Sequence, residues 1–176
     1  MLDYSFVDCD LETHGTQILE ILNEAIANST ALYDYQPRPI ESMTTWFANK
    51  AAGNFPVVGA IAADGTLLGF ATFGTFRAFP AYKYTVEHSI YIHRDARGHG
   101  LGKLLLGRII EEAQARDLHA IVGAIDASNQ ASMALHEKFG FKHVGTLPQV
   151  GFKFDKWLDL AFFELILDTP ANPVGE

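Results

Sequence analysis

The chain has 176 residues, of which 48% are hydrophobic, and a formal net charge of -8 from 13 basic and 21 acidic residues. This length and apolar content fit one globular domain with a substantial core, which we expect over residues 1–168, followed by a mobile tail over residues 169–176. The acidic balance argues against nucleic acid as a partner, because that function needs a basic face.

The cysteine content and the lengths of the apolar runs predict the compartment of the protein and whether it crosses a membrane. Cys9 is the single cysteine, and no cationic segment followed by an apolar run opens the sequence, so we expect a reducing cytoplasm. None of the local patterns of cysteine enzymes surrounds Cys9, which favours a buried thiol over a nucleophile. Because Glu164 interrupts even the apolar run at residues 162–167, we expect no membrane-spanning segment and no membrane partner.

Hydrophobic periodicity predicts the elements of the first half of the chain. In order, they are a strand at residues 4–9, a helix at 11–26, a helix at 40–47, and two strands at 55–62 and 67–76. Asp64-Gly65 signals a hairpin turn between the two strands. The segment between the helices is polar and aromatic, and its Tyr33 either walls a substrate pocket or packs the loop onto the core.

The second half alternates strands and helices. In order, it predicts a strand at residues 85–93, a glycine turn at 97–102, a helix from Leu104 to about Arg116, a strand at 120–125, a helix at 131–139, and strands at 141–144 and 161–167. Residues 147–158 form a glycine- and aromatic-containing excursion that either covers a pocket or makes a dimer contact. This order predicts an α/β layered fold on one mixed sheet.

The glycine turn is typical of a phosphate site, because a strand delivers it to a helix N-terminus. Residues 86–103 read VEHSIYIHRDARGHGLGK. Glycines let backbone N–H groups close on an anion, and the helix dipole favours negative charge there. Leu104 follows Lys103 where a P-loop has a hydroxyl residue, and the spacing also fails the G-x-G-x-x-G dinucleotide fingerprint. We therefore expect a different nucleotide cofactor.

Two motifs together match the pattern of a known superfamily. Arg97, Gly100 and Gly102 match a loop of the form R/Q-x-x-G-x-G/A, and residues 129–141 match a helix of the form N-x-x-S/A-x-x-L-Y-E-K-x-G-F. With these motifs the chain resembles the GNAT superfamily of acetyl-CoA-dependent N-acetyltransferases. The segments TVEHSIYI and QVGFKFDKWLDL resemble its phosphinothricin and methionine sulfoximine acetyltransferase branch. The resemblance implies a mostly antiparallel central sheet flanked by helices, acetyl-CoA as cosubstrate, and a homodimer.

The resemblance also implies where acetyl-CoA binds. Backbone groups of Ile90, Tyr91 and Ile92 are expected to pair with the pantetheine arm like an added strand. The residues expected at the pyrophosphate are Arg97, Gly98, His99, Gly100, Leu101, Gly102 and Lys103. Asn129 and Ser132 are expected to hold the pantetheine or the adenosine-side phosphates.

Glu87 is the candidate general base for the acceptor amine. It lies in a strand that is otherwise fit for burial, where the pKa of a carboxyl group tends to rise. The alternative is a structural carboxylate paired with a cation such as Arg77. The neighbouring His88 and Ser89 are expected to line the acceptor site, and His88 is a weaker candidate for proton transfer.

His136 is the second candidate catalytic residue. It stands where the family's helix usually has tyrosine, the residue that serves in many relatives as general acid toward the thiolate. A histidine can also carry this proton near neutral pH. Two alternatives stay open, namely that His136 assists Glu87 in deprotonating the amine and that it is a structural histidine.

The acceptor is expected to be a small amino-acid-like molecule. A second anionic group on it needs a cation, which Arg77 is placed to provide, with Ala78, Phe79 and Tyr33 around it. The alternative for Arg77 is a solvated loop residue. The histidines outside the site show no metal-ligand spacing, so no metal is expected.

Three functions follow in order of preference. The first is acetyl transfer to the α-amino group of methionine sulfoximine, methionine sulfone or phosphinothricin. The second is acetyl transfer to another amine, such as an ordinary amino acid, a polyamine or a protein N-terminus. The third is a non-catalytic CoA-binding sensor that kept the fold.

Overall fold

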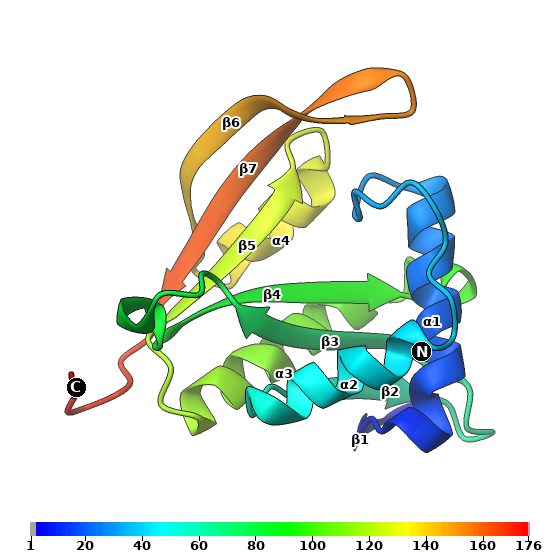
Figure 1. The fold of residues 1–176 in the computed structure, drawn as a ribbon, viewed down its shortest axis with the longest axis horizontal. Coiled ribbons are helices and arrows are strands. Elements are labelled where there is room, and N and C mark those ends of the chain that lie inside the picture. Colours follow the sequence, from blue (N-terminus) through cyan, green and yellow to red (C-terminus); the bar gives the residue numbers. More distant parts are fainter. Residues whose placement is uncertain (1–2, 176) are drawn as a thin grey trace. The chain divides into compact units, whose positions relative to one another are not determined.

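The elements of the computed structural model, which describes residues 3–175, confirm the predicted order of strands and helices (Figure 1). They are β1 (Ser5–Asp8), α1 (Leu11–Asn28), α2 (Ser42–Ala52), β2 (Val57–Ile61), β3 (Leu67–Thr75), β4 (Thr85–Ile92), α3 (Leu101–Ala115), β5 (Ala120–Asp126), α4 (Gln130–Lys138), β6 (Lys142–Lys153) and β7 (Lys156–Ile166). Short 3-10 turns occur at Pro80–Tyr82 and Arg94–Ala96.

The strands form a seven-stranded sheet in the order β1-β2-β3-β4-β5-β7-β6. Strands β4 and β5 are parallel, whereas β1–β2, β2–β3, β5–β7 and β6–β7 are antiparallel. The mixed, mostly antiparallel sheet expected from the sequence is thus confirmed. The chain divides into two compact units, one with the residues up to Gly74 and Ser89–Ile109, the other with Thr75–His88 and the residues from Ile110 onward. The single domain expected over residues 1–168 stays a prediction.

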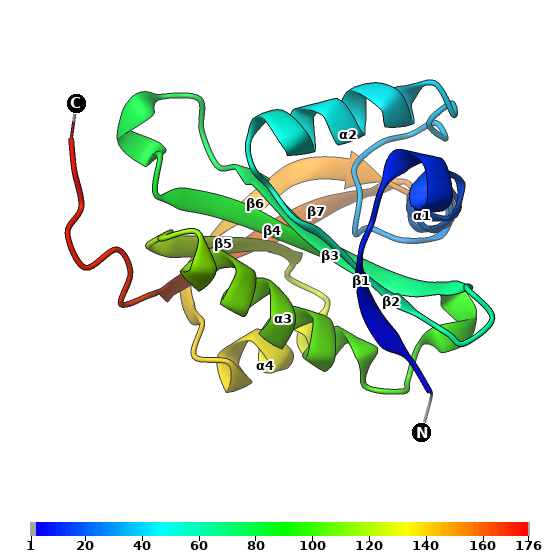
Figure 2. The ribbon, with the colours of Figure 1, turned by 90° about the horizontal axis from the view of Figure 1, so that it is seen from below.

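In the first unit, helices cover the strands β1 to β3. Figure 2 shows α1 and α2 on one face of these strands and the first part of α3 on the other. Helix α1 begins where the Asp10 carboxylate accepts a hydrogen bond from the Thr13 N–H (2.7 Å). This bond satisfies one of the N–H groups that have no carbonyl partner within the helix. The core of this unit combines residues of α1, α2, β2 and β3, namely Ile18, Leu19, Ile21, Leu22, Met43, Val57, Leu67 and Phe70.

Gly69 allows β4 to approach β3 closely within the first unit. A Cβ atom at position 69 would lie 2.8 Å from the Tyr91 carbonyl oxygen and 2.9 Å from the Ile92 Cδ1 atom. Both distances are too short for a real side chain, so glycine is required here for space. The close approach sets the position of the β4 segment that the sequence assigns to the cofactor.

In the second unit, β5 is the central strand. The first half of β4 runs parallel to it, with Glu87 opposite Val122, and β7 runs antiparallel on its other side. In Figure 1, α4 lies behind β5, and β6 runs alongside β7. The buried aromatic residues Phe141 and Phe163 fill the space next to α4.

The prediction for residues 141–167 is wrong in one respect, because the excursion at 147–158 belongs to a long β-hairpin. Strands β6 and β7 meet at a two-residue turn, Phe154 and Asp155, whose φ angles of 52° and 58° are positive. Such turns normally carry glycine or asparagine, so this one has no turn signal. Strand β6 is mostly exposed on both faces, and therefore it shows no alternation of apolar and polar residues.

The C-terminal residues contact Lys83 and Tyr84, which belong to the same unit. The Val174 N–H donates to the Tyr84 hydroxyl oxygen (3.0 Å), and Lys83 Nζ donates to the Gly175 carbonyl (2.8 Å). The expected mobility of this tail stays a prediction. Over residues 3–175, none of the helices combines the length and the apolar character that crossing a membrane would require.

Candidate active site

Strand β4 carries the candidate base and the segment assigned to the pantetheine arm. Val86 and His88 are buried, whereas Glu87 on the opposite face of the strand is half-buried. Burial raises the pKa of the Glu87 carboxyl group above its ordinary value. Within the second unit as described, Glu87 has no ion-pair partner, and the Arg77 guanidinium instead lies 5.5 Å from the centre of the Phe76 ring. This arrangement favours the general base over the structural carboxylate.

His88 points into the core and meets His136 of α4. The two Nε2 atoms are 2.9 Å apart, and His136 Nδ1 lies 2.7 Å from the Ser132 carbonyl oxygen. Because a carbonyl only accepts, His136 carries its hydrogen on Nδ1 and, when neutral, accepts at Nε2. His88 must therefore donate its Nε2–H to His136. Burial lowers the pKa of both histidines, that of His88 to about 3 with a contribution from His136.

The histidine pair is buried and closely packed. A Cβ atom at Gly123 of β5 would lie 3.0 Å from His88 Nε2 and 3.3 Å from His136 Nε2, so a larger residue there would press on the pair. The Phe141 ring lies edge-on to both imidazoles, at 5.7 and 5.0 Å between ring centres. The geometry favours the structural alternative for His136, and its role as acid or base stays a prediction.

Two residues of the glycine loop adopt the left-handed backbone conformation, which is an element of many anion-binding loops. Gly98 and Gly100 have φ angles of 80° and 82°, and a Cβ atom at either position would meet nothing within 4 Å. Glycine is therefore needed here for conformation and not for space. Exposed N–H groups in such a loop, next to a helix N-terminus, suit the pyrophosphate of a nucleotide. These residues fit acetyl-CoA.

Helix α3 begins at Leu101 and not at Leu104, so the predicted helix start is corrected by three residues. The Lys103 N–H donates to the Gly100 carbonyl (3.1 Å), which closes the first turn. Leu101 is 2% exposed, and its burial fixes the helix start one residue after Gly100. Leu101 and Gly102 thus lie at the helix N-terminus, where backbone N–H groups point out of the helix, whereas the Lys103 N–H is taken up by Gly100.

Arg97 makes a contact that the sequence did not predict. Its guanidinium forms an ion pair with the Glu24 carboxylate of α1, and its Nε donates to the Ile92 carbonyl (3.2 Å). His99 Nδ1 lies 2.9 Å from the Arg97 carbonyl oxygen. No sequence signal links Glu24 with Arg97, because 73 positions separate them.

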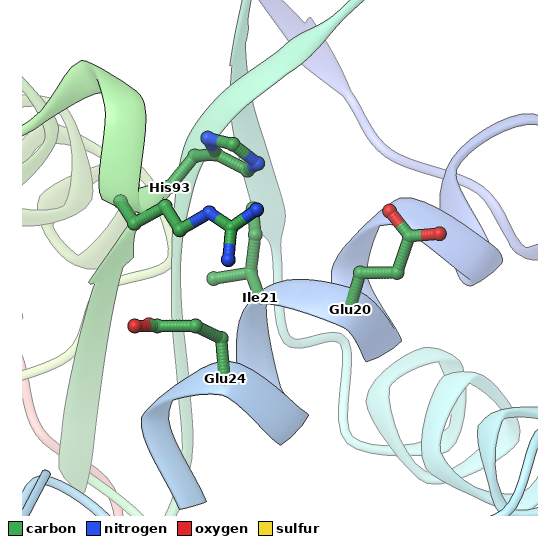
Figure 3. Close-up of a pocket in the computed structure, with 5 residues that line it drawn as sticks. Glu20, Ile21, Glu24 and His93 are labelled. Atoms are coloured by element: carbon green, nitrogen blue, oxygen red, sulfur yellow. The ribbon is translucent and has the colours of Figure 1, made fainter. Parts of the chain in front are cut away.

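Glu24 also borders a pocket of about 210 Å³ in the first unit. Figure 3 shows Glu20 and Glu24 extending from α1 on either side of Ile21, with His93 opposite. Arg94 completes the lining. The pocket combines two carboxylates with basic side chains and has no assigned ligand.

The other predicted residues divide between the two units. Asn129 caps α4, since its side-chain oxygen accepts from the Ser132 N–H (3.1 Å). Arg77, Ala78 and Phe79 are exposed in the segment after β3, in the same unit as Glu87. Tyr33, in the other unit, is 38% exposed. Residues 3–175 contain no group of three or more His, Cys, Asp or Glu side chains that could hold a metal ion.

Comparison with known proteins identifies the family. Residues 19–141 match the Acetyltransferase (GNAT) family. The chain belongs to this family. It is similar to the L-methionine sulfoximine/L-methionine sulfone acetyltransferase of Pseudomonas aeruginosa, at 44% identity over 86% of this chain and 88% of that one. It is 40% identical to the L-amino acid N-acyltransferase MnaT of Escherichia coli, over 89% and 90% of the two chains.

Solved structures of GNAT acetyltransferases share this fold. An N-acetyltransferase from Staphylococcus aureus Mu50 is 49% identical with a TM-score of 0.90, over 93% of this chain and 98% of that one. A phosphinothricin acetyltransferase from Sinorhizobium meliloti, solved in complex with AcCoA, is 31% identical with a TM-score of 0.92, over 98% and 94%. The GNAT fold and the N-acetyltransferase class expected from the sequence are thus confirmed.

Proposed function

We propose that this GNAT enzyme transfers the acetyl group of acetyl-CoA directly to the α-amino group of methionine sulfoximine, methionine sulfone or phosphinothricin. The observation that carries the proposal is the 44% identity to the Pseudomonas aeruginosa enzyme over 86% of the chain. Bound acetyl-CoA would supply the acetyl group of its thioester: an amide bond forms at the amine, the C–S bond breaks, and CoA leaves as the thiol with the second proton that the amine gives up. A neutral amine is needed to attack the thioester, so the enzyme must first remove a proton from the acceptor's ammonium group.

Glu87 takes this proton, directly or through a water molecule. Support for this role comes from its half-buried position on β4 and from the raised pKa of its carboxyl group, which brings a carboxylate closer to the range of an effective general base. Ser89 lies on the same face of the strand as Glu87 and lines the acceptor site. Backbone groups of Ile90, Tyr91 and Ile92 hold the pantetheine arm, and the N–H groups of residues 98–102 hold the pyrophosphate, with the Lys103 side chain adding positive charge.

His136 keeps a neutral ring in this proposal and does not exchange a proton with the substrate. Its Nδ1–H is engaged by the Ser132 carbonyl, and its Nε2 accepts from His88. With both nitrogens in hydrogen bonds and the residue 4% exposed, it lacks a free position for a proton. The pair instead supports the part of β4 that carries Glu87, while Asn129 and Ser132 contact the pantetheine or the adenosine-side phosphates.

The acceptor preference is tested by following thiol release from acetyl-CoA with a panel of amines. Replacing Arg77 with glutamine is expected to raise the KM for phosphinothricin by roughly tenfold or more, because a charge-assisted hydrogen bond to the acceptor's second anionic group is lost. The matched control is Lys83→Gln, another exposed cation of the segment after β3, which should leave this KM unchanged. An Arg77→Gln variant with the wild-type KM would remove Arg77 from the acceptor site.

A second acceptor class is an ordinary L-amino acid, favoured by the 40% identity to the Escherichia coli L-amino acid N-acyltransferase. The same panel separates the two classes when methionine and leucine are included. Higher kcat/KM for these than for methionine sulfoximine would make the ordinary amino acid the preferred acceptor. Tight CoA binding without turnover of any amine would favour a sensor.

We further propose a cytoplasmic homodimer that uses the β6–β7 hairpin. The hairpin exposes several large apolar side chains, namely Val144, Leu147, Val150, Phe152, Phe154 and Trp157. Such a concentration of apolar surface is typical of an interface. Trp157, which is 61% exposed, packs edge-on against Phe152 with 5.0 Å between ring centres.

The Trp157→Glu variant is expected to sediment as a monomer at concentrations where the wild type is a dimer, because a charge replaces an aromatic anchor of the interface. Tyr35→Glu, at a position 69% exposed in the other unit, serves as the control and should leave the mass unchanged. A wild type that sediments as a monomer at micromolar concentration contradicts the proposed dimer.

A further inference from the structure

We propose that Glu24 of α1 is a positioning residue for the cofactor. It holds the Arg97 side chain and thereby fixes the start of the loop at residues 98–103 in its anion-binding conformation. The inference rests on the proposed use of acetyl-CoA, and it adds a residue that lies far from the loop in the sequence.

All three nitrogen atoms of the Arg97 guanidinium have a partner. Nη2 meets Glu24 Oε2, Nη1 lies 3.5 Å from Glu24 Oε1, and Nε donates to the Ile92 carbonyl oxygen at 3.2 Å. The carboxylate and the guanidinium therefore face each other with both pairs of atoms, the geometry that gives arginine its orientational preference. The Glu24 side chain is 20% exposed and the Arg97 side chain is 50% exposed, so water screens part of the attraction within this pair.

These contacts distinguish two possible roles of Arg97, as a ligand of the phosphate and as an anchor of the loop. If Arg97 were itself a phosphate ligand, the pyrophosphate would have to compete with a carboxylate that already neutralises the guanidinium. In the contacts described, Arg97 instead joins α1 to the end of β4 immediately before the glycine turn. The binding of the anion then depends on backbone N–H groups of the loop and on the N-terminus of α3.

The loop needs such an anchor because its own composition does not fix it. Gly98 and Gly100 adopt positive φ angles, and no atom lies within 4 Å of the position of a Cβ at either residue. Glycine has the largest conformational freedom of any residue, so a free loop would lose entropy when it closes on a ligand. An anchor at Arg97 reduces this loss before the ligand arrives.

The test is the affinity for CoA, measured by calorimetric titration of the full-length chain. Glu24→Gln is expected to raise the Kd for CoA by roughly two- to fivefold, because a neutral amide holds the guanidinium less well. Arg97→Lys should raise it similarly, since an ammonium cannot meet the carboxylate and the Ile92 carbonyl in the same way. Glu20→Gln is the matched control: Glu20 borders the same pocket one turn earlier on α1 and has no ion-pair partner within residues 3–175.

Kinetics with two acetyl donors provide the second readout. With acetyl-CoA, the Glu24→Gln variant should show a higher KM and a kcat within about twofold of the wild type. With acetylated pantetheine, which lacks the pyrophosphate, the variant and the wild type should have equal kcat/KM. A general loss of structure would lower activity with both donors and so would contradict the inference.

Two results overturn the proposed role of Glu24. Tighter CoA binding by Glu24→Gln would mean that Arg97, once released, is a direct phosphate ligand. An unchanged Kd in both Glu24→Gln and Arg97→Lys would mean that the ion pair does not position the loop. Absence of CoA binding by the wild type and by Glu20→Gln would remove the proposed function itself, and this inference with it.

Discussion

Replacing Glu87 with glutamine is expected to lower kcat by about 10²- to 10⁴-fold, the usual contribution of a general base. Glutamine keeps the size of the side chain and cannot accept the proton of the acceptor's ammonium group. The KM for acetyl-CoA should change little, because the cofactor is assigned to other residues of β4 and to the glycine loop. Steady-state thiol release with methionine sulfoximine measures both constants.

The pH dependence gives this prediction a second test. Since burial raises the pKa of Glu87, the wild-type kcat/KM should fall as the pH decreases through that raised pKa, and the Glu87→Gln variant should lack this limb. The control is Glu164→Gln: Glu164 of β7 and Glu87 both lie opposite Val122 in the sheet register. Full activity of the Glu87 variant, or an equal loss in the Glu164 variant, would remove Glu87 as the base.

The free energy of unfolding is expected to decrease as the pH falls below about 6.5, the ordinary pKa of a histidine, through the His88–His136 pair. Burial lowers the pKa of both groups in the folded protein, that of His88 to about 3. The unfolded chain therefore binds more protons than the folded one between these values, so stability is complete above pH 6.5 and is lost toward pH 3. The slope is at most about 1.4 kcal/mol per pH unit for each histidine.

Urea unfolding at pH 7 and pH 5.5 measures this loss. The His88→Asn variant is expected to be less stable at pH 7 and to show a smaller decrease between the two values, because one group that charges on unfolding is absent. His143→Gln, which removes a mostly exposed histidine outside the pair, is the matched control for the loss of one histidine. An identical pH dependence in His88→Asn and the wild type contradicts a neutral buried pair.

Much of the fold could be predicted because its signals are local. Apolar residues at helical spacing after Asp10 located α1, and the Asp10 carboxylate does cap that helix. The Asp64-Gly65 turn located the hairpin of β2 and β3, where Gly65 has the positive φ angle that such a turn requires. Hydrophobic periodicity and the residue types of turns each involve only a few neighbouring residues, so they can be recognised in the sequence alone.

The errors occur where local signals are weak. Strand β6 is mostly exposed on both faces and its turn to β7 contains phenylalanine and aspartate, so neither alternation nor turn composition marks the hairpin in the sequence. The sequence predicts the start of α3 at Leu104, because it assigns residues 97–102 to a glycine turn. Burial of Leu101 and the bond from Lys103 to Gly100 decide that start, and both depend on the folded chain.

For the site, the sequence by itself determined the class of cofactor loop, the candidate base and the GNAT family, because each depends on residue types at short, fixed spacing. Only the tertiary structure decided which partners these residues have. It joined His88 to His136 across 48 positions and Arg97 to Glu24 across 73. A side chain's protonation and charge depend on such distant partners and on burial, neither of which is encoded in local spacing. The structure therefore changed the interpretation of His136 and Arg97 while leaving that of Glu87 in place.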